Sequence, residues 1–181
     1  MNRRNFLDLG LAGLAAGAAG ALLPSVALAQ SALPVKGVAP EITEGGPWFN
    51  SAAPQTLEKL RGKVVLVNFW TFACINCQHT LPHVRALYQK YHNQGFEILG
   101  VHTPELVFER DLGNVQAAIK KESITWPVVF DGQYKVWNSY DNQFWPAFYY
   151  IDKKGRIRYT HFGEGEYATQ DDVVKQLLAE A

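Results

Sequence analysis

The chain has 181 residues, of which 48% are hydrophobic and 19% are charged. This length suits about one domain, and the composition can build a buried core, which excludes an intrinsically disordered protein. Seventeen basic side chains balance seventeen acidic ones, so we expect no nucleic-acid partner, because nucleic-acid-binding domains carry a basic surplus. The two cysteines lie three positions apart and cannot close the long loops of a disulfide-stapled mini-protein.

The first 29 residues have the layout of an export signal. Arg3 and Arg4 form a basic tip, and an apolar stretch covers residues 9–23. Ala27-Leu28-Ala29 then supplies small residues for cleavage before Gln30. The paired arginines resemble the twin-arginine signal. The apolar stretch is shorter than the roughly 20 residues of a membrane-spanning helix, so we expect a cleaved signal over residues 1–29, with a membrane anchor as the alternative.

Export would place the mature chain in the periplasm or another extracytoplasmic compartment, where disulfides form and persist. After the signal, residues 30–55 contain four prolines and the pair Gly45-Gly46. This predicts an extended lead-in, with room for a short strand or hairpin around Trp48-Phe49. Thr56 is placed to cap a short helix over residues 57–61, which the following glycine would end.

The pattern then predicts a strand, a helix and a second strand. Residues 64–70 are almost continuously apolar and β-branched, as in a strand covered on both faces. Apolar side chains recur at steps of three and four from Cys74 to Tyr91, which indicates a helix that ends at Gly95. Pro82 should kink this helix. The next strand covers residues 96–101, and the three elements form a right-handed unit with a parallel strand pair.

The rest of the chain continues the alternation of strands and helices. In chain order the pattern predicts a helix over 113–122, a strand over 127–130, hairpin strands over 148–151 and 156–159, and a helix over 171–180. Strands that alternate with helices in this way predict an α/β fold.

A zinc site is the first interpretation to test for the Cys74-x-x-Cys77 motif. The chain has no second cysteine pair, and the nearby candidates are His79 and His83. On one helix Cys77 and His79 would lie about 200° apart, so the four side chains cannot converge on one ion. We therefore expect no metal site.

A redox pair is the interpretation that the position of the motif favours. Cys74 follows a buried strand and a short turn, at the start of a helix. The free backbone N–H groups and the dipole of a helix N-terminus stabilise a thiolate there, which makes Cys74 the nucleophile. Cys77 lies one turn further along, more shielded, and is placed to resolve a mixed disulfide by attacking Cys74.

The segment KVVLVNFWTFACINC, residues 63–77, resembles the active-site segment of the thioredoxin superfamily. More narrowly, the chain is similar to exported TlpA-like thioredoxins, in the neighbourhood of the redoxin and AhpC/TSA-like families, and within them to the soluble domain of DipZ-type proteins. Further matches are the segments LPHV at 81–84, GVHTPE at 100–105 and FGEG at 162–165. The resemblance implies a thioredoxin-like fold over residues 56–181, with a central mixed β-sheet flanked by helices and a TlpA-type helical insertion.

The resemblance also implies a cis-proline that faces the cysteine pair. Pro146 is the matching position, and the backbone before a cis-proline can pair with a substrate strand. Trp126-Pro127 is a rival that is more typical of an ordinary turn. Trp70 is expected beside the active site, and Trp145 as the floor of a substrate groove, so we assign both to substrate binding together with Pro146.

The chain departs from the thioredoxin pattern below the active site. Many thioredoxins carry a buried Asp where this chain has Asn68, which cannot accept a proton. Deprotonation of Cys77 must then use another group or water. We name Glu97, Glu105 and His102 as the candidates for proton handling.

Two alternative functions remain open at this point. Thr71-Phe72-Ala73-Cys74 matches the T-x-x-C core of peroxiredoxins, which predicts a thiol peroxidase with antioxidant activity that uses Cys74. The second alternative is a copper(I)-binding or delivery protein, because thiolates suit this soft ion. Copper(I) proteins of the thioredoxin fold carry C-x-x-x-C with a distant His. In this chain the cysteine spacing is one residue shorter, and His161 is the one late candidate.

The function predicted from the sequence is that of an exported thiol–disulfide oxidoreductase. It would cycle between a Cys74–Cys77 disulfide and a dithiol and exchange disulfides with partner proteins, such as apocytochrome c or other exported proteins. A membrane thiol carrier would supply electrons if the protein is a reductant. We expect a monomer with no dissociable cofactor.

Overall fold

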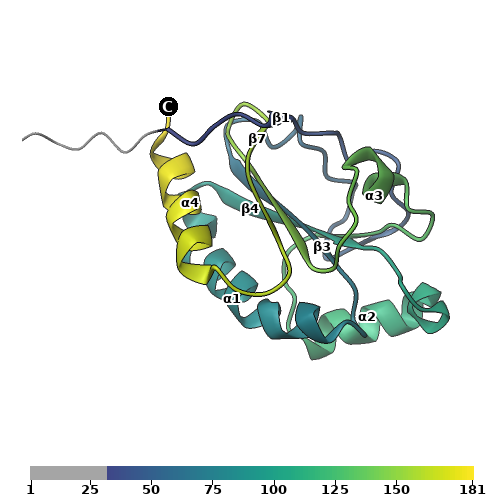
Figure 1. Cartoon of the computed structure of the whole chain (residues 1–181). Coiled ribbons are helices and arrows are strands. Elements are labelled where there is room, and N and C mark those ends of the chain that lie inside the picture. Colours follow the sequence, from purple (N-terminus) through teal and green to yellow (C-terminus); the bar gives the residue numbers. More distant parts are fainter. Residues whose placement is uncertain (1–31) are drawn as a thin grey trace, which may run out of the picture. The chain divides into compact units, whose positions relative to one another are not determined.

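The structure, a computed structural model, describes residues 32–181, so the expected signal over residues 1–29 lies outside the described residues. A seven-stranded sheet with the order β1-β7-β6-β3-β4-β5-β2 forms its centre (Figure 1). The strands are β1 (Gly37–Val38), β2 (Trp48–Phe49), β3 (Val64–Trp70), β4 (Phe96–His102), β5 (Val128–Phe130), β6 (Ala147–Ile151) and β7 (Arg156–Phe162).

The sheet is mixed. Strands β3, β4 and β5 are parallel, whereas β6, β7 and β1 continue the sheet antiparallel on one side and β2 pairs antiparallel with β5 on the other. Trp70 lies opposite His102 in the register of β3 and β4. The carboxyl ends of the two central strands therefore meet at one edge of the sheet, the usual place for a site in an open α/β sheet.

Helices cover the sheet in two layers. They are α1 (Ile75–Tyr91), α2 (Leu112–Lys121), α3 (Lys135–Ser139) and α4 (Tyr167–Ala179), with 3-10 turns η1 (His92–Gln94) and η2 (Val107–Arg110). Figure 1 shows α1, α2 and α4 on one side of the sheet and α3 with the lead-in on the other. All seven residues of β3 are buried because both of its faces are covered, as its continuous apolar pattern predicts.

The predicted strand–helix–strand unit is confirmed. Helix α1 runs through Pro82 to Tyr91, η1 follows, and Gly95 ends the segment with a left-handed φ of 92°. Strand β4 then lies parallel to β3. The hairpin of β6 and β7 and a strand at Trp48-Phe49 are also confirmed.

Three local predictions were wrong. Residues 57–61 form turns and no α-helix, because their backbone bonds, such as Leu60 N–H to the Leu57 carbonyl at 3.1 Å, close over three residues only. Helix α3 was missed; the Asp131 carboxylate accepts from the backbone of Val136 and Trp137 and so starts it. Helix α4 begins at Tyr167, four residues before the predicted start.

No helix of residues 32–181 is long and apolar enough to cross a membrane. The segment that joins β4 to β5, residues 103–127, contains η2 and α2. We call it the β4–β5 connection. It lies at the carboxyl edge of the sheet, where it contacts the residues just before α1.

Candidate redox site

Cys74 and Cys77 lie at the start of α1. Cys74 is the N-cap residue with an extended backbone, and the N–H of Cys77 donates to its Sγ at 3.2 Å. Cys74 is half-buried, whereas Cys77 is 1% exposed. Both are free thiols in this structure. The helix N-terminus therefore presents one accessible sulfur and shields the other.

The two thiols differ in acidity. A hydrogen bond from the Cys77 thiol lowers the pKa of Cys74 to about 7; burial opposes this, and backbone N–H groups of Cys77 and Asn76 add to it. Burial raises the pKa of Cys77 well above its usual range, and its hydrogen bond to Cys74 raises it further. The arrangement favours a thiolate at Cys74 and a protonated thiol at Cys77.

A buried carboxylate that the sequence analysis missed lies beside the pair. Glu109, in η2, is 0% exposed. Its Oε1 accepts from the Thr71 hydroxyl and from the Ala73 N–H at 2.8 Å, and its Oε2 accepts from the N–H groups of Glu105 and Leu106 at 2.8 Å each. Burial raises the pKa of Glu109, but these hydrogen bonds outweigh burial and lower it.

Only part of a local signal for Glu109 was present in the sequence, because Leu106 is not the Ser, Thr, Asp or Asn usual at an N-cap. Glutamate three residues after the N-cap of a helical turn accepts from the free N–H groups at that N-terminus, and Glu109 has this place relative to Leu106 in η2. Its bonds to Thr71 and Ala73 span more than thirty residues and had no local signal.

His102 is buried at the carboxyl end of β4. Its ring stacks between Phe72 and Phe130, and Nε2 lies 3.4 Å from the Thr71 hydroxyl oxygen. Burial lowers the pKa of His102 to about 4, although the charge of Glu109 opposes this. The imidazole is therefore neutral near pH 7 and lies within reach of the Thr71–Glu109 contact.

The two predicted carboxylates lie in different places. The exposed Glu105 lies near the site, and its charge acts to raise the pKa of Cys74. Glu97 is not brought to the site. It is opposite Val65 in the register, five residues or about 17 Å from the carboxyl end of the strands, and it pairs with Lys63 at 2.8 Å.

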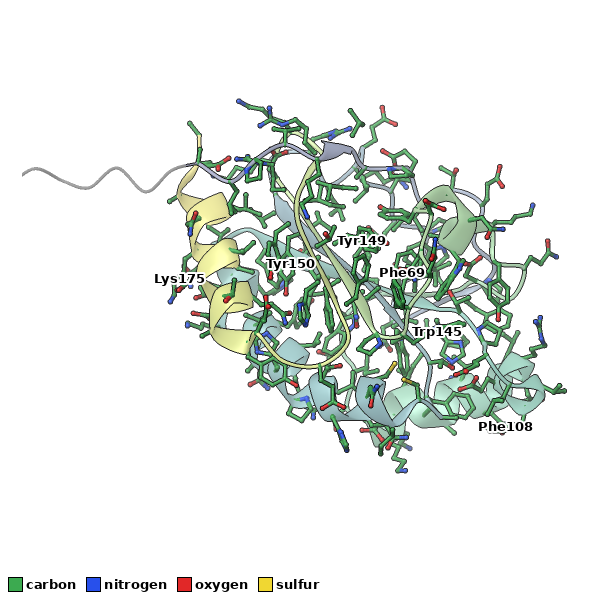
Figure 2. The ribbon with its side chains drawn as sticks, viewed as in Figure 1. Phe69, Phe108, Trp145, Tyr149, Tyr150 and Lys175 are labelled. Atoms are coloured by element: carbon green, nitrogen blue, oxygen red, sulfur yellow. The ribbon has the colours of Figure 1, made fainter. Side chains whose placement is uncertain are left out.

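The Trp145–Pro146 bond is cis. Within residues 32–181 no other peptide bond is cis, so the rival Trp126–Pro127 bond is trans. Pro146 is buried, and its carbonyl accepts from Gly163 N–H at 2.9 Å. The Trp145 indole donates to the Thr103 carbonyl at 3.1 Å. Trp145, which is labelled in Figure 2, and Cys74 pack against the same core cluster.

Trp70 lies beside the site, as expected, but its side chain is buried in the core. It is 1% exposed, lies in the core and meets His102 edge to face at 5.1 Å. A side chain without accessible surface cannot contact a partner, so its place in the substrate-binding set is corrected to a core residue that supports the site.

The side chains that a thiol peroxidase or a copper(I) site would need, Thr71 and His161, contact other groups. The Thr71 hydroxyl is buried and donates to Glu109, so it does not face a peroxide at Cys74. His161 lies in β7 near the Glu164 carbonyl, at 3.3 Å, and its ring is 5.9 Å from that of Phe148. No group of three or more metal-ligating side chains occurs within residues 32–181.

Comparisons with known proteins agree with this site. The Redoxin family profile matches residues 38–178. Protein DipZ of Mycobacterium tuberculosis is 44% identical over 147 residues, which are 80% of this chain and 21% of DipZ. Thiol-disulfide oxidoreductase YkuV of Bacillus subtilis is 30% identical over 78% of this chain and 94% of its own length.

Solved structures agree as well. The crystal structure of a thioredoxin-like superfamily protein has a TM-score of 0.74 and 29% identity, and the match covers 80% of this chain and 98% of that one. The chain spans about a fifth of the length of the DipZ proteins that it matches. With its thioredoxin-like fold and its cysteine pair at the start of α1, the chain belongs to the Redoxin family and to the TlpA-like branch of the thioredoxin superfamily.

Proposed function

We propose that this chain is an exported thiol–disulfide oxidoreductase that exchanges disulfides with partner proteins through Cys74 and Cys77. The difference between the two thiols is the observation that carries the proposal. The half-buried Cys74 has a pKa of about 7, whereas burial keeps the more shielded Cys77 protonated. A nucleophile with a pKa near ambient pH attacks disulfides efficiently.

The exchange proceeds in two balanced steps. The Cys74 thiolate attacks one sulfur of a partner disulfide, which forms a mixed disulfide and releases the partner's other sulfur as a thiolate that takes a proton. Cys77 then loses its proton and attacks Cys74, which releases the partner's second thiolate. The partner gains two electrons and two protons, and the pair becomes the Cys74–Cys77 disulfide. The reverse sequence oxidises a partner dithiol.

The partner segment would lie along the backbone before Pro146. Trp145 is held there by its bond to Thr103 and by its contact with Trp137, whose ring centroid is 4.1 Å away. An extended partner strand can pair with backbone groups held in this way. Protein thiols and disulfides are the substrate class, with apocytochrome c or other exported proteins as candidates.

Export and electron supply complete the proposal. The basic tip and apolar stretch within residues 1–29 support a twin-arginine route to the periplasm or another extracytoplasmic compartment. A membrane thiol carrier would re-reduce the pair if the protein acts as a reductant. The cycle needs no dissociable cofactor, and a single copy of the chain can carry it out.

Serine variants test the roles of the two sulfurs. Cys74→Ser should abolish the reduction of insulin disulfides by the protein, because no thiolate remains to attack. Cys77→Ser should accumulate mixed disulfides, because nothing resolves them. Non-reducing electrophoresis after incubation with a disulfide-containing peptide measures both. Unchanged turnover by Cys74→Ser, or trapping by Cys74→Ser instead of Cys77→Ser, would contradict the assignment.

A further inference from the structure

We propose that Glu109 is a positioning residue for this exchange: it joins the segment before Cys74 to the β4–β5 connection and holds a fixed negative charge beside Cys77. The inference rests on the proposed function and adds a residue to it.

Glu109 holds two segments together. One oxygen accepts from Thr71 and Ala73, which precede the nucleophile, and the other accepts from Glu105 and Leu106. Charge-assisted hydrogen bonds of this kind are the stronger ones. The carboxylate therefore fixes the position of the Cys74-bearing segment relative to the β4–β5 connection.

Among residues 32–181 Glu109 forms no ion pair. Its charge is stabilised by neutral hydrogen-bond donors alone, so a net charge of −1 remains at this position. The neighbouring titratable groups are Cys77, His102, Glu105 and Tyr134. Cys77 is the one that must lose a proton during the reaction.

The charge affects the two redox states differently. The disulfide form is neutral, whereas the dithiol form carries thiolate near pH 7. A fixed negative charge beside the pair disfavours thiolate, and this charge contributes to the raised pKa of Cys77. Glu109 therefore keeps Cys77 protonated until it attacks. Its Oε1 also accepts from the N–H of Ala73, next to Cys74, so the same charge disfavours the Cys74 thiolate and shifts the exchange equilibrium towards the disulfide form.

Glu109→Gln removes the charge and keeps half of the hydrogen bonds. The glutamine oxygen can still accept from Thr71 and Ala73, but its NH₂ group meets the N–H groups of Glu105 and Leu106, which also donate. We expect the equilibrium constant with glutathione to move at least about threefold towards the dithiol, in line with the effect of a nearby charge. Amide hydrogen exchange should become faster at Glu105 and Leu106.

Two controls accompany this variant. Glu97→Gln removes a carboxylate at the far end of β4 and should leave the equilibrium unchanged. Glu109→Asp keeps the charge and should return the equilibrium to within about twofold of the wild type, although its shorter side chain cannot reach both segments. If Glu109→Gln does not fold, Thr71→Val serves in its place and should speed amide exchange at Ala73.

The outcomes are distinguishable. If the folded Glu109→Gln protein matches the wild type in equilibrium constant and amide exchange, the inference is overturned while the proposed function stands. The same holds if Thr71→Val leaves amide exchange at Ala73 unchanged, or if Glu109→Asp shifts the equilibrium as far as Glu109→Gln. If the wild type forms no reversible disulfide, the proposed function itself fails.

Discussion

Each end of the central sheet holds a buried carboxylate, but the partners of the two carboxylates differ. Asp152 follows β6, whose Ile151 pairs with Val65 near the amino end of β3. Its carboxylate accepts from Arg156 at 2.7 Å and from Arg158 at 3.0 Å. Glu109, at the carboxyl end, is equally buried but accepts from a hydroxyl and three backbone N–H groups.

The pKa of each carboxyl group is lowered despite burial, but for different reasons. Arg156 and Arg158 pair with Asp152, so its charge is balanced by neighbouring cations and these contacts serve stability. Hydrogen bonds alone lower the pKa of Glu109, so the charge remains effective on its neighbours. The comparison teaches that a buried carboxylate without a cation marks the end of the sheet where chemistry depends on charge.

Breaking the buried ion pair between Asp152 and Arg158 should have the largest effect on stability. Arg158 is 4% exposed and also pairs with Glu180. Arg158→Met would leave a buried carboxylate with Arg156 as its remaining cation, and we expect a loss of about 3 kcal/mol in the free energy of unfolding, as for other broken buried pairs. Urea denaturation measures the loss. The rate of disulfide exchange should be unchanged, and a large fall in this rate at full folding would contradict the division between the two ends.

Removing Cys77 should change the acidity of Cys74. A hydrogen bond from the Cys77 thiol is the main cause of the lowered Cys74 pKa. In the wild type the rate of iodoacetamide alkylation should rise with pH, with a midpoint at about 7, because the thiolate is the reactive form. In Cys77→Ala the midpoint should move upwards, towards about 8.5. An unchanged midpoint would assign the low pKa to the helix N-terminus alone.

A partly exposed carboxylate should have the smallest effect and provides a reference for the other two. Asp171 in α4 accepts from Lys175, Lys90 and Tyr91, which lowers its pKa to about 2 although burial opposes this. The folded pKa lies below the unfolded value of about 3.9, so the contribution is present above pH 4 and is lost as the pH falls through 2. We expect Asp171→Asn to cost about 0.5 kcal/mol near pH 7, as for other exposed pairs, and a shallower loss of stability in acid. A loss near that of Arg158→Met would contradict the distinction between the buried carboxylate Asp152 and the partly exposed Asp171.

Local patterns predicted much of the fold because its central elements have strong local signals. The apolar run over residues 64–70 and the helical periodicity after Cys74 gave β3 and α1 at nearly the correct bounds. Helix α3 has five residues and no periodicity of its own. Its start depends on Asp131, which lies several residues before the helix. Capping patterns expect the capping side chain directly before the first turn, but here that position is Tyr134, with a left-handed backbone.

The part of the site that has local signals in the sequence was predicted, and the part that depends on tertiary contacts was not. The cysteine pair and the resemblance placed Cys74, Cys77 and the cis bond before Pro146. Glu109 was missed because its role depends on Thr71 and Ala73, which reach it only through the tertiary fold. Glu97 was a reasonable candidate by residue type, but the strand register places it at the opposite end of β4.

The reduction potential of the pair tests the central claim most directly. The full chain is equilibrated in dithiol/disulfide buffers of known potential, alkylated and resolved by mass. We expect Cys74 and Cys77 to be oxidised together in one two-electron transition, between about −120 and −270 mV, the range of related redox proteins. Oxidation of Cys74 alone to a sulfenic or sulfinic acid, with Cys77 still a thiol at every potential, would contradict the claim.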